Sequence, residues 1–191
     1  AIGQAQLMHM YDTLFSEYNC TVAQILLTDE NVENEKSAAN LSITFDTLLE
    51  MGVIPIVNEN DSVASTEIES GHHKVLGDND TLSAIVAKFC KADLLILMSD
   101  IDGLYNADPR KNADAKLIHE VDELTPEIYE MAGGAGTTHG TGGMVTKLSA
   151  AKIATEAGVD MYIINSDNVD NLYDIFEGKA VGTLFKAHKR G

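Results

Sequence analysis

The sequence has few basic residues and no long apolar run. Only 13 of its 191 residues are Lys or Arg, against 30 Asp or Glu, so the formal net charge is −17. No Lys/Arg cluster comes before the last few residues, Lys186 to Arg190. Such a chain repels nucleic acid and anionic membranes. No stretch approaches the roughly 18 apolar residues that a membrane span needs, so neither nucleic acid nor a membrane is an expected partner.

Cysteine is also scarce. The two thiols, Cys20 and Cys90, each lie in or beside an apolar stretch. Two cysteines in a chain of this size are typical of reduced, buried residues rather than of a disulfide framework. We therefore expect a cytoplasmic protein, and we assign neither thiol a catalytic or metal-binding role.

Several common catalytic motifs are missing. The chain contains no HExxH or cysteine-based zinc pattern, no EF-hand loop, no Walker A loop, no GxGxxG turn and no serine nucleophile elbow. His72 and His73 are adjacent and are expected to be solvated. No metal ligands are predicted, and any phosphate-binding loop has to be of another kind.

What the sequence does contain is a regular alternation of amphipathic helices and short apolar strands. Helices are expected at 2–18, about 41–51, 82–89, after Thr125-Pro126, about 143–157 and near 171–176, and strands at 21–27, 53–57, 94–98 and 161–164. Strands of this type suit a parallel sheet covered by helices on both faces. The sequence therefore predicts a single α/β domain over residues 1–191.

Polar residues collect at the carboxyl ends of three predicted strands. Asn58-Glu59-Asn60-Asp61 follows strand 53–57, Ser99-Asp100-Ile101-Asp102-Gly103 follows 94–98, and Asn165-Ser166-Asp167 follows 161–164. Ligands of open α/β sheets bind at this edge. Loops are polar in any case, so one such cluster would mean little, but three on one edge favour a binding site.

The sequence Asp78-Asn79-Asp80 follows Gly77 and precedes the helix expected at 82–89. Asp and Asn are favoured helix N-caps, and carboxylates suit the first turn. One cap needs only one such residue. The run is therefore long enough to cap the helix and also to present a side chain to a ligand.

A glycine-rich segment, Gly133 to Met144, leads into the helix that carries Lys147. Small residues let main-chain N–H groups approach a phosphate, and a helix N-terminus adds donors and the positive end of the helix dipole. Glycine content alone would indicate only a surface loop. The Thr141-Gly-Gly-Met-x-x-Lys147 run, with an ammonium group about one turn into the helix, favours anion binding.

Taken together, these motifs resemble the amino acid kinase family, and within it the enzymes that phosphorylate glutamate. The resemblance spans essentially the whole chain. It is carried by Asn58-Glu-Asn-Asp61, Gly77-Asp-Asn-Asp80, Ser99-Asp100 with Gly103-Leu-Tyr-x-Ala-Asp-Pro109, and Thr141-Gly-Gly-Met-x-x-Lys147. The family fold that it implies is a three-layer α/β/α sandwich with a mainly parallel central sheet.

The resemblance also implies substrates, L-glutamate and ATP with Mg²⁺, and a role for each candidate residue. Asp61, Asn79 and Asn58 would bind glutamate, Lys147 would neutralise charge on the transferred phosphoryl group, and Asp80 would orient the catalytic lysines. The residues expected to bind ATP are Ser99, Asp100, Thr141, Gly142, Gly143, Met144, Val145, Thr146 and Lys147. The family further implies feedback inhibition by proline and a homo-oligomer, a dimer or tetramer.

The chain departs from the family pattern at its N-terminal side. The family's Lys-Leu-Gly-Thr/Ser strand, which carries a second catalytic lysine, and a later Ser-Gly-Ala segment are not in this sequence, and no PUA domain follows it. A molecule that began at Ala1 is therefore expected to be inactive and poorly folded.

Two alternatives stay open at the level of sequence. One is another amino acid kinase, acting on a nucleotide or on carbamate. The other is a non-catalytic, amino-acid-binding module derived from a kinase.

Overall fold

The structure, a computed structural model, describes residues 3–60, 75–133 and 142–188. The chain divides into two compact units, Ala1–Leu82 and Ser83–Gly191. Each unit has a sheet of its own, with two strands in the first and four in the second. The single domain predicted over residues 1–191 stays a prediction.

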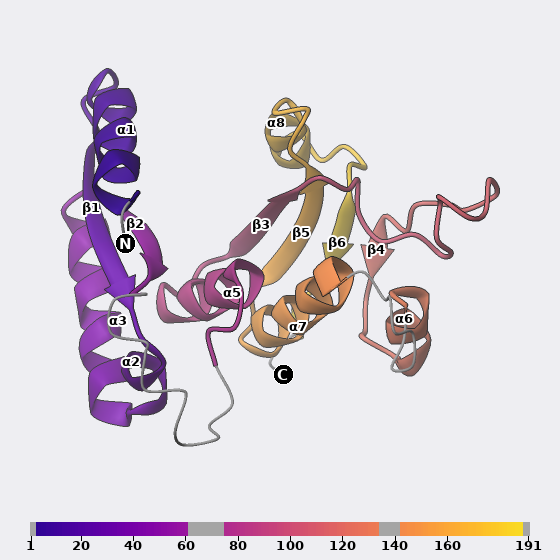
Figure 1. Cartoon of the computed structure of the whole chain (residues 1–191), viewed down its shortest axis with the longest axis horizontal. Coiled ribbons are helices and arrows are strands. Elements are labelled where there is room, and N and C mark those ends of the chain that lie inside the picture. Colours follow the sequence, from indigo (N-terminus) through magenta and orange to yellow (C-terminus); the bar gives the residue numbers. More distant parts are fainter. Residues whose placement is uncertain (1–2, 61–74, 134–141, 189–191) are drawn as a thin grey trace. The chain divides into compact units, whose positions relative to one another are not determined.

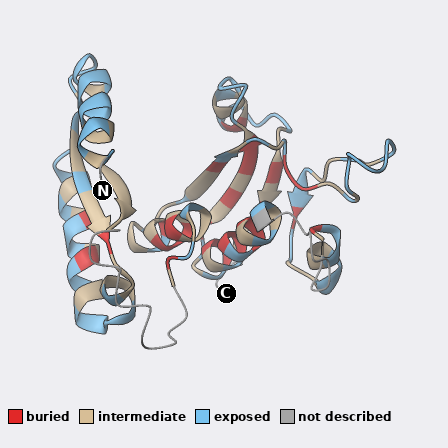
Figure 2. Ribbon diagram, in the orientation of Figure 1, coloured by how far each residue is buried: buried red, intermediate tan, exposed pale blue. Residues whose placement is uncertain are grey.

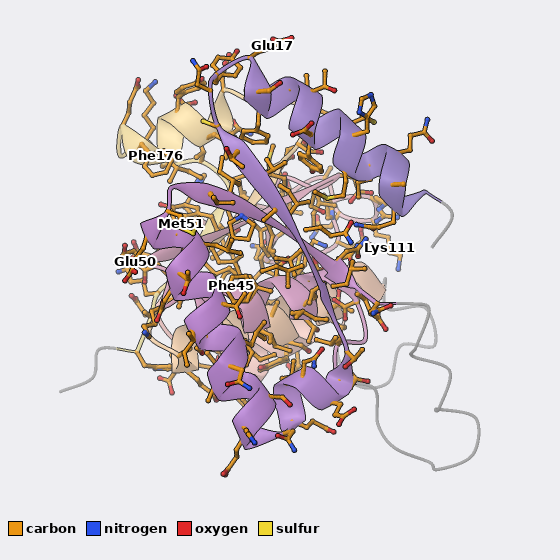
Figure 3. The ribbon with its side chains drawn as sticks, turned by 90° about the vertical axis from the view of Figure 1, so that its left-hand side faces the viewer. Glu17, Phe45, Glu50, Met51, Lys111 and Phe176 are labelled. Atoms are coloured by element: carbon orange, nitrogen blue, oxygen red, sulfur yellow. The ribbon has the colours of Figure 1, made fainter. Side chains whose placement is uncertain are left out.

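The first unit is built around two parallel strands (Figure 1). Its complete elements are α1 (Gln4–Ser16), β1 (Thr21–Leu27), α2 (Asp29–Glu33), α3 (Glu35–Glu50) and β2 (Val53–Glu59). The strands pair from Thr21 opposite Val53 to Leu27 opposite Glu59. Asn34 caps α3 by accepting two main-chain N–H groups. Phe45, labelled in Figure 3, has none of its surface exposed and is a buried residue of α3.

The second unit holds a mixed sheet in the order β3-β5-β6-β4. Helix α5 (Asn79–Phe89) begins just before this unit. The unit contains β3 (Leu94–Ser99), β4 (Glu120–Val121), α6 (Pro126–Met131), α7 (Gly142–Glu156), β5 (Asp160–Asn165), α8 (Asn171–Phe176) and β6 (Thr183–Phe185). Strands β3 and β5 run parallel, as do β4 and β6, whereas β5 and β6 are antiparallel.

Much of the core of the second unit lies between α7 and β5. Figure 2 shows buried residues concentrated on α7 and β5. Ala150, Ala151 and Ala154 of α7 have no exposed surface, and neither do Met161 and Ile163 of β5. Small side chains on the helix let it approach the strand closely, and close packing of this kind maximises dispersion contacts.

The strands predicted from the sequence are confirmed, and three of them, β2, β3 and β5, are longer than expected. β2 continues to Glu59 and β3 continues to Ser99, so the first polar residues after the apolar runs belong to the strands themselves. The elements that the sequence did not predict are the short ones, α2, β4 and β6, which have too few residues to show a period. In the described ranges, none of the helices combines the length and apolar character that a membrane span requires.

Candidate active site

The ends of β3 and β5 bring two of the predicted polar clusters to one edge of the second unit's sheet. Ser99 and Asn165, the last residues of these parallel strands, pair with each other. The Ser166 N–H donates to the Ser99 carbonyl oxygen over 2.7 Å, which extends the pairing beyond the strands. The third predicted cluster begins with the last two residues of β2, Asn58 and Glu59, in the first unit.

Ser99 and Asp100 present polar side chains at this edge. The Ser99 hydroxyl donates to Asp100 Oδ1 over 3.2 Å, and the Asp100 side chain is exposed. A hydroxyl and a carboxylate at the carboxyl end of a parallel strand pair are placed where α/β proteins bind ligands.

A network that the sequence did not predict lies beside these two residues. Asp102 Oδ1 accepts a hydrogen bond from Asn165 Nδ2 over 2.8 Å, and Asp102 Oδ2 accepts one from the Tyr105 hydroxyl over 2.9 Å. The hydrogen bond to Asp102, followed by partial burial and the Asp102 charge, raises the pKa of Tyr105 above its usual value. The residue types were visible at the strand ends, but their pairing depends on the β3–β5 register.

Just after Asp102 the chain passes very close to the start of β6. A Cβ atom on Gly103, where φ is +150°, would collide with the Thr183 hydroxyl and lie 3.1 Å from the Thr183 nitrogen. The buried Thr183 hydroxyl accepts the Leu104 N–H over 2.8 Å and donates to the Ile118 carbonyl oxygen over 2.6 Å. Only glycine fits this approach, which explains the Gly103-Leu-Tyr motif.

Lys147 lies on α7, one turn after the helix begins, and only 8% of its surface is exposed. Its neighbour Leu148 belongs to the core. Met144 packs against the same core, Val145 is 45% exposed, and the Thr146 hydroxyl donates to the Gly143 carbonyl oxygen over 3.0 Å. The predicted helix start after the glycine-rich segment is therefore confirmed. Thr141 lies outside the described residues.

In the first unit, Asn58 lies near the end of β2. Its Nδ2 donates to Gln4 Oε1 over 3.1 Å, and Gln4 Nε2 donates to Gln24 Oε1 over 3.2 Å. Gln24 pairs with Ile56, two residues before Asn58, so the two side chains share a face of the sheet. The amide of Gln4 at the start of α1 thereby orients Asn58. Asp61 lies outside the described residues.

The capping role predicted for the run Asp78-Asn79-Asp80 is confirmed. Asp78 caps the helix, because its two carboxylate oxygens accept the Thr81 N–H at 2.9 Å and the Thr81 hydroxyl at 3.1 Å. Asn79 and Asp80 occupy the first turn. The fully buried Leu76 precedes the cap, and its N–H donates to Asp29 Oδ1 over 2.8 Å. Asp29 of α2 therefore helps to set the path of the chain into α5, and no local sequence pattern predicts this contact.

In the parts of the chain that the structure describes, no three His, Cys, Asp or Glu side chains come together in a way that could hold a metal ion. The second unit thus carries a helix start with a buried lysine and a polar strand edge, and the first unit carries a capped helix start with an amide and a carboxylate.

Residues 1–165 match the model of the amino acid kinase family. The chain belongs to this family. The resemblance that the motifs predicted is confirmed at that level, and the match extends over the first unit of this amino acid kinase and most of the second.

The chain is similar to curated glutamate 5-kinases, the activity that the motifs indicated. The chain is 56% identical over 189 residues to the glutamate 5-kinase of Clostridium perfringens (strain 13 / Type A), covering 99% of this chain and 70% of the relative. It is 54% identical to the glutamate 5-kinase of Clostridium tetani (strain Massachusetts / E88), covering 68% of that protein. A glutamate 5-kinase of Carboxydothermus hydrogenoformans (strain ATCC BAA-161 / DSM 6008 / Z-2901) is 53% identical, and the chain covers 49% of it.

Solved structures of other kinases share the fold. The isopentenyl phosphate kinase of T. acidophilum superimposes with a TM-score of 0.59 at 17% identity, covering 95% of this chain and 67% of that one. The uridylate kinase of Archaeoglobus fulgidus gives 0.52 at 23% identity, covering 86% and 61%. At these identities the likeness concerns the fold alone, and it confirms the predicted α/β/α class with mainly parallel strands.

Proposed function

We propose that this protein transfers the γ-phosphoryl group of ATP to the γ-carboxylate of L-glutamate, the first step of proline biosynthesis. The observation that carries the proposal is the 56% identity, over 189 residues, to a glutamate 5-kinase. In the reaction a carboxylate oxygen forms a bond to the γ-phosphorus, and the bond from that phosphorus to ADP breaks. Such a transfer depends on positioning and charge neutralisation rather than on a covalent catalyst.

The residues proposed for the nucleotide belong to the second unit, except for Thr141, which lies outside the described residues. Ser99 and Asp100 would contact the nucleotide from the edge of β3, while the phosphates would meet the start of α7. That helix offers the unpaired N–H groups and positive dipole end that phosphates favour. Lys147 would place its ammonium group on the transferred phosphoryl group. The residues proposed for the phosphates are Thr141, Gly142, Gly143, Met144, Val145, Thr146 and Lys147.

The residues proposed for glutamate belong to the first unit. Asn58, oriented by Gln4, and Asn79, in the first turn of a capped helix, would donate and accept hydrogen bonds on glutamate. Asp61 would pair with its amino group. Asp80 would orient the catalytic lysines, which include Lys147. These roles come from the family motif, and the oriented Asn58 and the capped helix start are what the structure adds in their support.

ATP would enter as MgATP. Magnesium retains several waters and is usually held by substrate phosphates with one or two carboxylates. The described side chains include no cluster of three potential metal ligands, and an ion that arrives bound to the nucleotide requires none.

The proposal includes three further properties. Proline, the end product, would act as feedback inhibitor, the protein would form a dimer or tetramer, and it would work in the cytoplasm. Nucleic acid is not proposed as a partner, because a net charge of −17 repels it.

A test of the function uses the protein expressed from its complete reading frame. Release of ADP is followed with ATP and one acceptor at a time, and hydroxylamine is added to trap an acyl phosphate as its hydroxamate. We expect turnover with L-glutamate and formation of γ-glutamyl hydroxamate. Turnover with UMP or carbamate instead would favour a different amino acid kinase, and glutamate binding without turnover would favour a non-catalytic module.

A further inference from the structure

Asp102 uses both of its carboxylate oxygens to connect two separate segments. One oxygen accepts from Asn165, the last residue of β5, and the other accepts from Tyr105, three residues further along the loop that follows β3. Distances of 2.8 and 2.9 Å are typical of strong hydrogen bonds, and those to an ionised acceptor are stronger than neutral ones. Figure 1 shows the ends of β3 and β5 side by side, where these segments meet.

The Asn165 end of this connection is itself well held. Asn165 pairs with Ser99 across the strands. Its Oδ1 accepts the Asp167 N–H over 2.8 Å, and its carbonyl oxygen accepts from Asn171 Nδ2 of α8 over 3.2 Å. Asp102 is therefore tied to the frame of the sheet rather than to another loop.

The chain after Asp102 is held by other contacts. Leu104, 1% exposed, donates its N–H to Thr183, and Tyr105 forms an isolated bridge with Leu117. Ser99 precedes the loop and is fixed by the strand pairing. The stretch from Asp100 to Asp102 lies between these two held points, so its path depends most on the Asp102 side chain.

We propose that Asp102 is a positioning residue for the nucleotide: held between Tyr105 and Asn165, it fixes the segment that carries Asp100 beside Ser99. The proposal rests on the proposed function, in which Ser99 and Asp100 contact ATP. A displacement of about 1 Å in groups that bind a reactant is enough to weaken its binding. Because Asp102 is exposed, its loss should disturb the loop without unfolding the unit.

The test compares Asp102→Ala with Asp102→Asn. Alanine removes both hydrogen bonds, whereas an amide can still accept from Asn165 and donate to the Tyr105 hydroxyl oxygen. We expect Asp102→Ala to raise the KM for ATP about tenfold while the KM for glutamate and kcat stay within about twofold, and Asp102→Asn to restore most of the affinity for ATP. Asp114→Ala, in the same connection between β3 and β4, serves as control and should behave like the wild type.

Two supporting variants test the mechanism of positioning. Tyr105→Phe and Asn165→Ala each remove one hydrogen bond of the network. When either is combined with Asp102→Ala, the KM for ATP should rise by less than the product of the two single increases, since residues of one network are coupled. Additive effects would contradict the network. An unchanged KM for ATP in Asp102→Ala, or an equal loss of all kinetic parameters together with a lowered Tm, would overturn the positioning role.

Binding of a non-hydrolysable ATP analogue, measured by calorimetry without glutamate, separates this proposal from the proposed function. Weaker analogue binding by Asp102→Ala than by the wild type supports the positioning role even if glutamate were not the acceptor. Equal binding by the two proteins contradicts it even if glutamate turnover is confirmed.

Discussion

Lys147 is 8% exposed on a helix whose neighbouring residues form the core. A lysine buried this far is rare, because its long side chain can usually extend to water. The proposed task is to meet the transferred phosphoryl group where α7 begins.

Replacing Lys147 by methionine tests that role. Methionine keeps the length of the side chain and packs well in irregular spaces, so the fold should survive. The loss of one charged group that stabilises a transition state typically costs about 10²–10³ in kcat, and we expect a loss of that size in ADP release with glutamate.

The control for Lys147→Met is Lys152→Met on the same helix. Lys152 is exposed and reaches Glu156 over 3.9 Å, an exposed pair worth little. Its variant should keep full activity. If the Lys147→Met enzyme is as active as the Lys152→Met enzyme, Lys147 does not have the proposed role.

The ionisation of Tyr105 allows a second test on a single residue. The hydrogen bond to Asp102, with partial burial and the Asp102 charge, raises its pKa, so the neutral phenol is favoured in the folded protein. Its contribution to stability is therefore complete below the usual tyrosine pKa of about 10 and is lost as pH rises through the higher folded value.

The phenol can be titrated by ultraviolet absorbance, as the difference between the wild type and Tyr105→Phe. We expect the Tyr105 pKa to fall in Asp102→Ala. Identical titration curves in both backgrounds would mean that the two side chains do not interact in solution.

At the scale of elements, the start of α5 depends on one side chain. Asp78 accepts the Thr81 N–H, and replacing such a cap by alanine typically costs about 1 kcal/mol. We expect Asp78→Ala to lower the free energy of unfolding by about that amount, to speed hydrogen exchange at the Thr81 amide and to raise the KM for glutamate, because Asn79 lies in the same turn.

Asp78→Asn is the matched control, since asparagine caps helices about as well as aspartate. It should retain both stability and affinity for glutamate. If the KM for glutamate stays at the wild-type value in Asp78→Ala, the start of α5 does not contribute to glutamate binding.

The junction of β5 and β6 depends on Gly182. Its φ is +57°, and a Cβ atom there would collide with the Ile163 carbonyl oxygen and lie 2.8 Å from Ile164 Cγ2. We expect Gly182→Ala to lower the free energy of unfolding in urea by about 3 kcal/mol, from backbone strain and lost strand pairing together.

Gly178→Ala separates these two contributions. Gly178 has a similar φ of +74°, but a Cβ atom added there would meet no atom of the described residues within 4 Å. Only backbone strain of roughly 1 kcal/mol therefore applies to this variant. Equal losses in the two variants would show that the close approach at Gly182 contributes nothing.

The elements also show what the sequence could and could not predict. Helix α7 and strand β5 were predictable because apolar periodicity and a glycine-rich start mark them. The cap by Asp78 was predictable because it is local. The contacts Asp102–Asn165 and Asp29–Leu76 join residues 63 and 47 positions apart, and no local pattern reveals which strands or loops become neighbours.

At the scale of the whole molecule, the proposed site residues divide between the two units. Asn58, Asn79 and Asp80, proposed for glutamate and for orienting the lysines, belong to the first, and Ser99, Asp100 and Lys147, proposed for ATP, belong to the second. The motifs predicted this set from the sequence, since each follows a strand or begins a helix. The division into two sheets was not predicted, because apolar strands alone do not specify which strands pair.

The proposed reaction of this amino acid kinase is the phosphorylation of glutamate. Its most direct test is ADP release and hydroxamate formation by the protein expressed from its complete reading frame, with MgATP and L-glutamate, and with UMP, carbamate and L-aspartate as rival acceptors. We expect ADP release that depends on glutamate, an equal amount of γ-glutamyl hydroxamate, and little turnover with the other acceptors. A protein that binds MgATP but forms no γ-glutamyl hydroxamate, or one that prefers a rival acceptor, would contradict it.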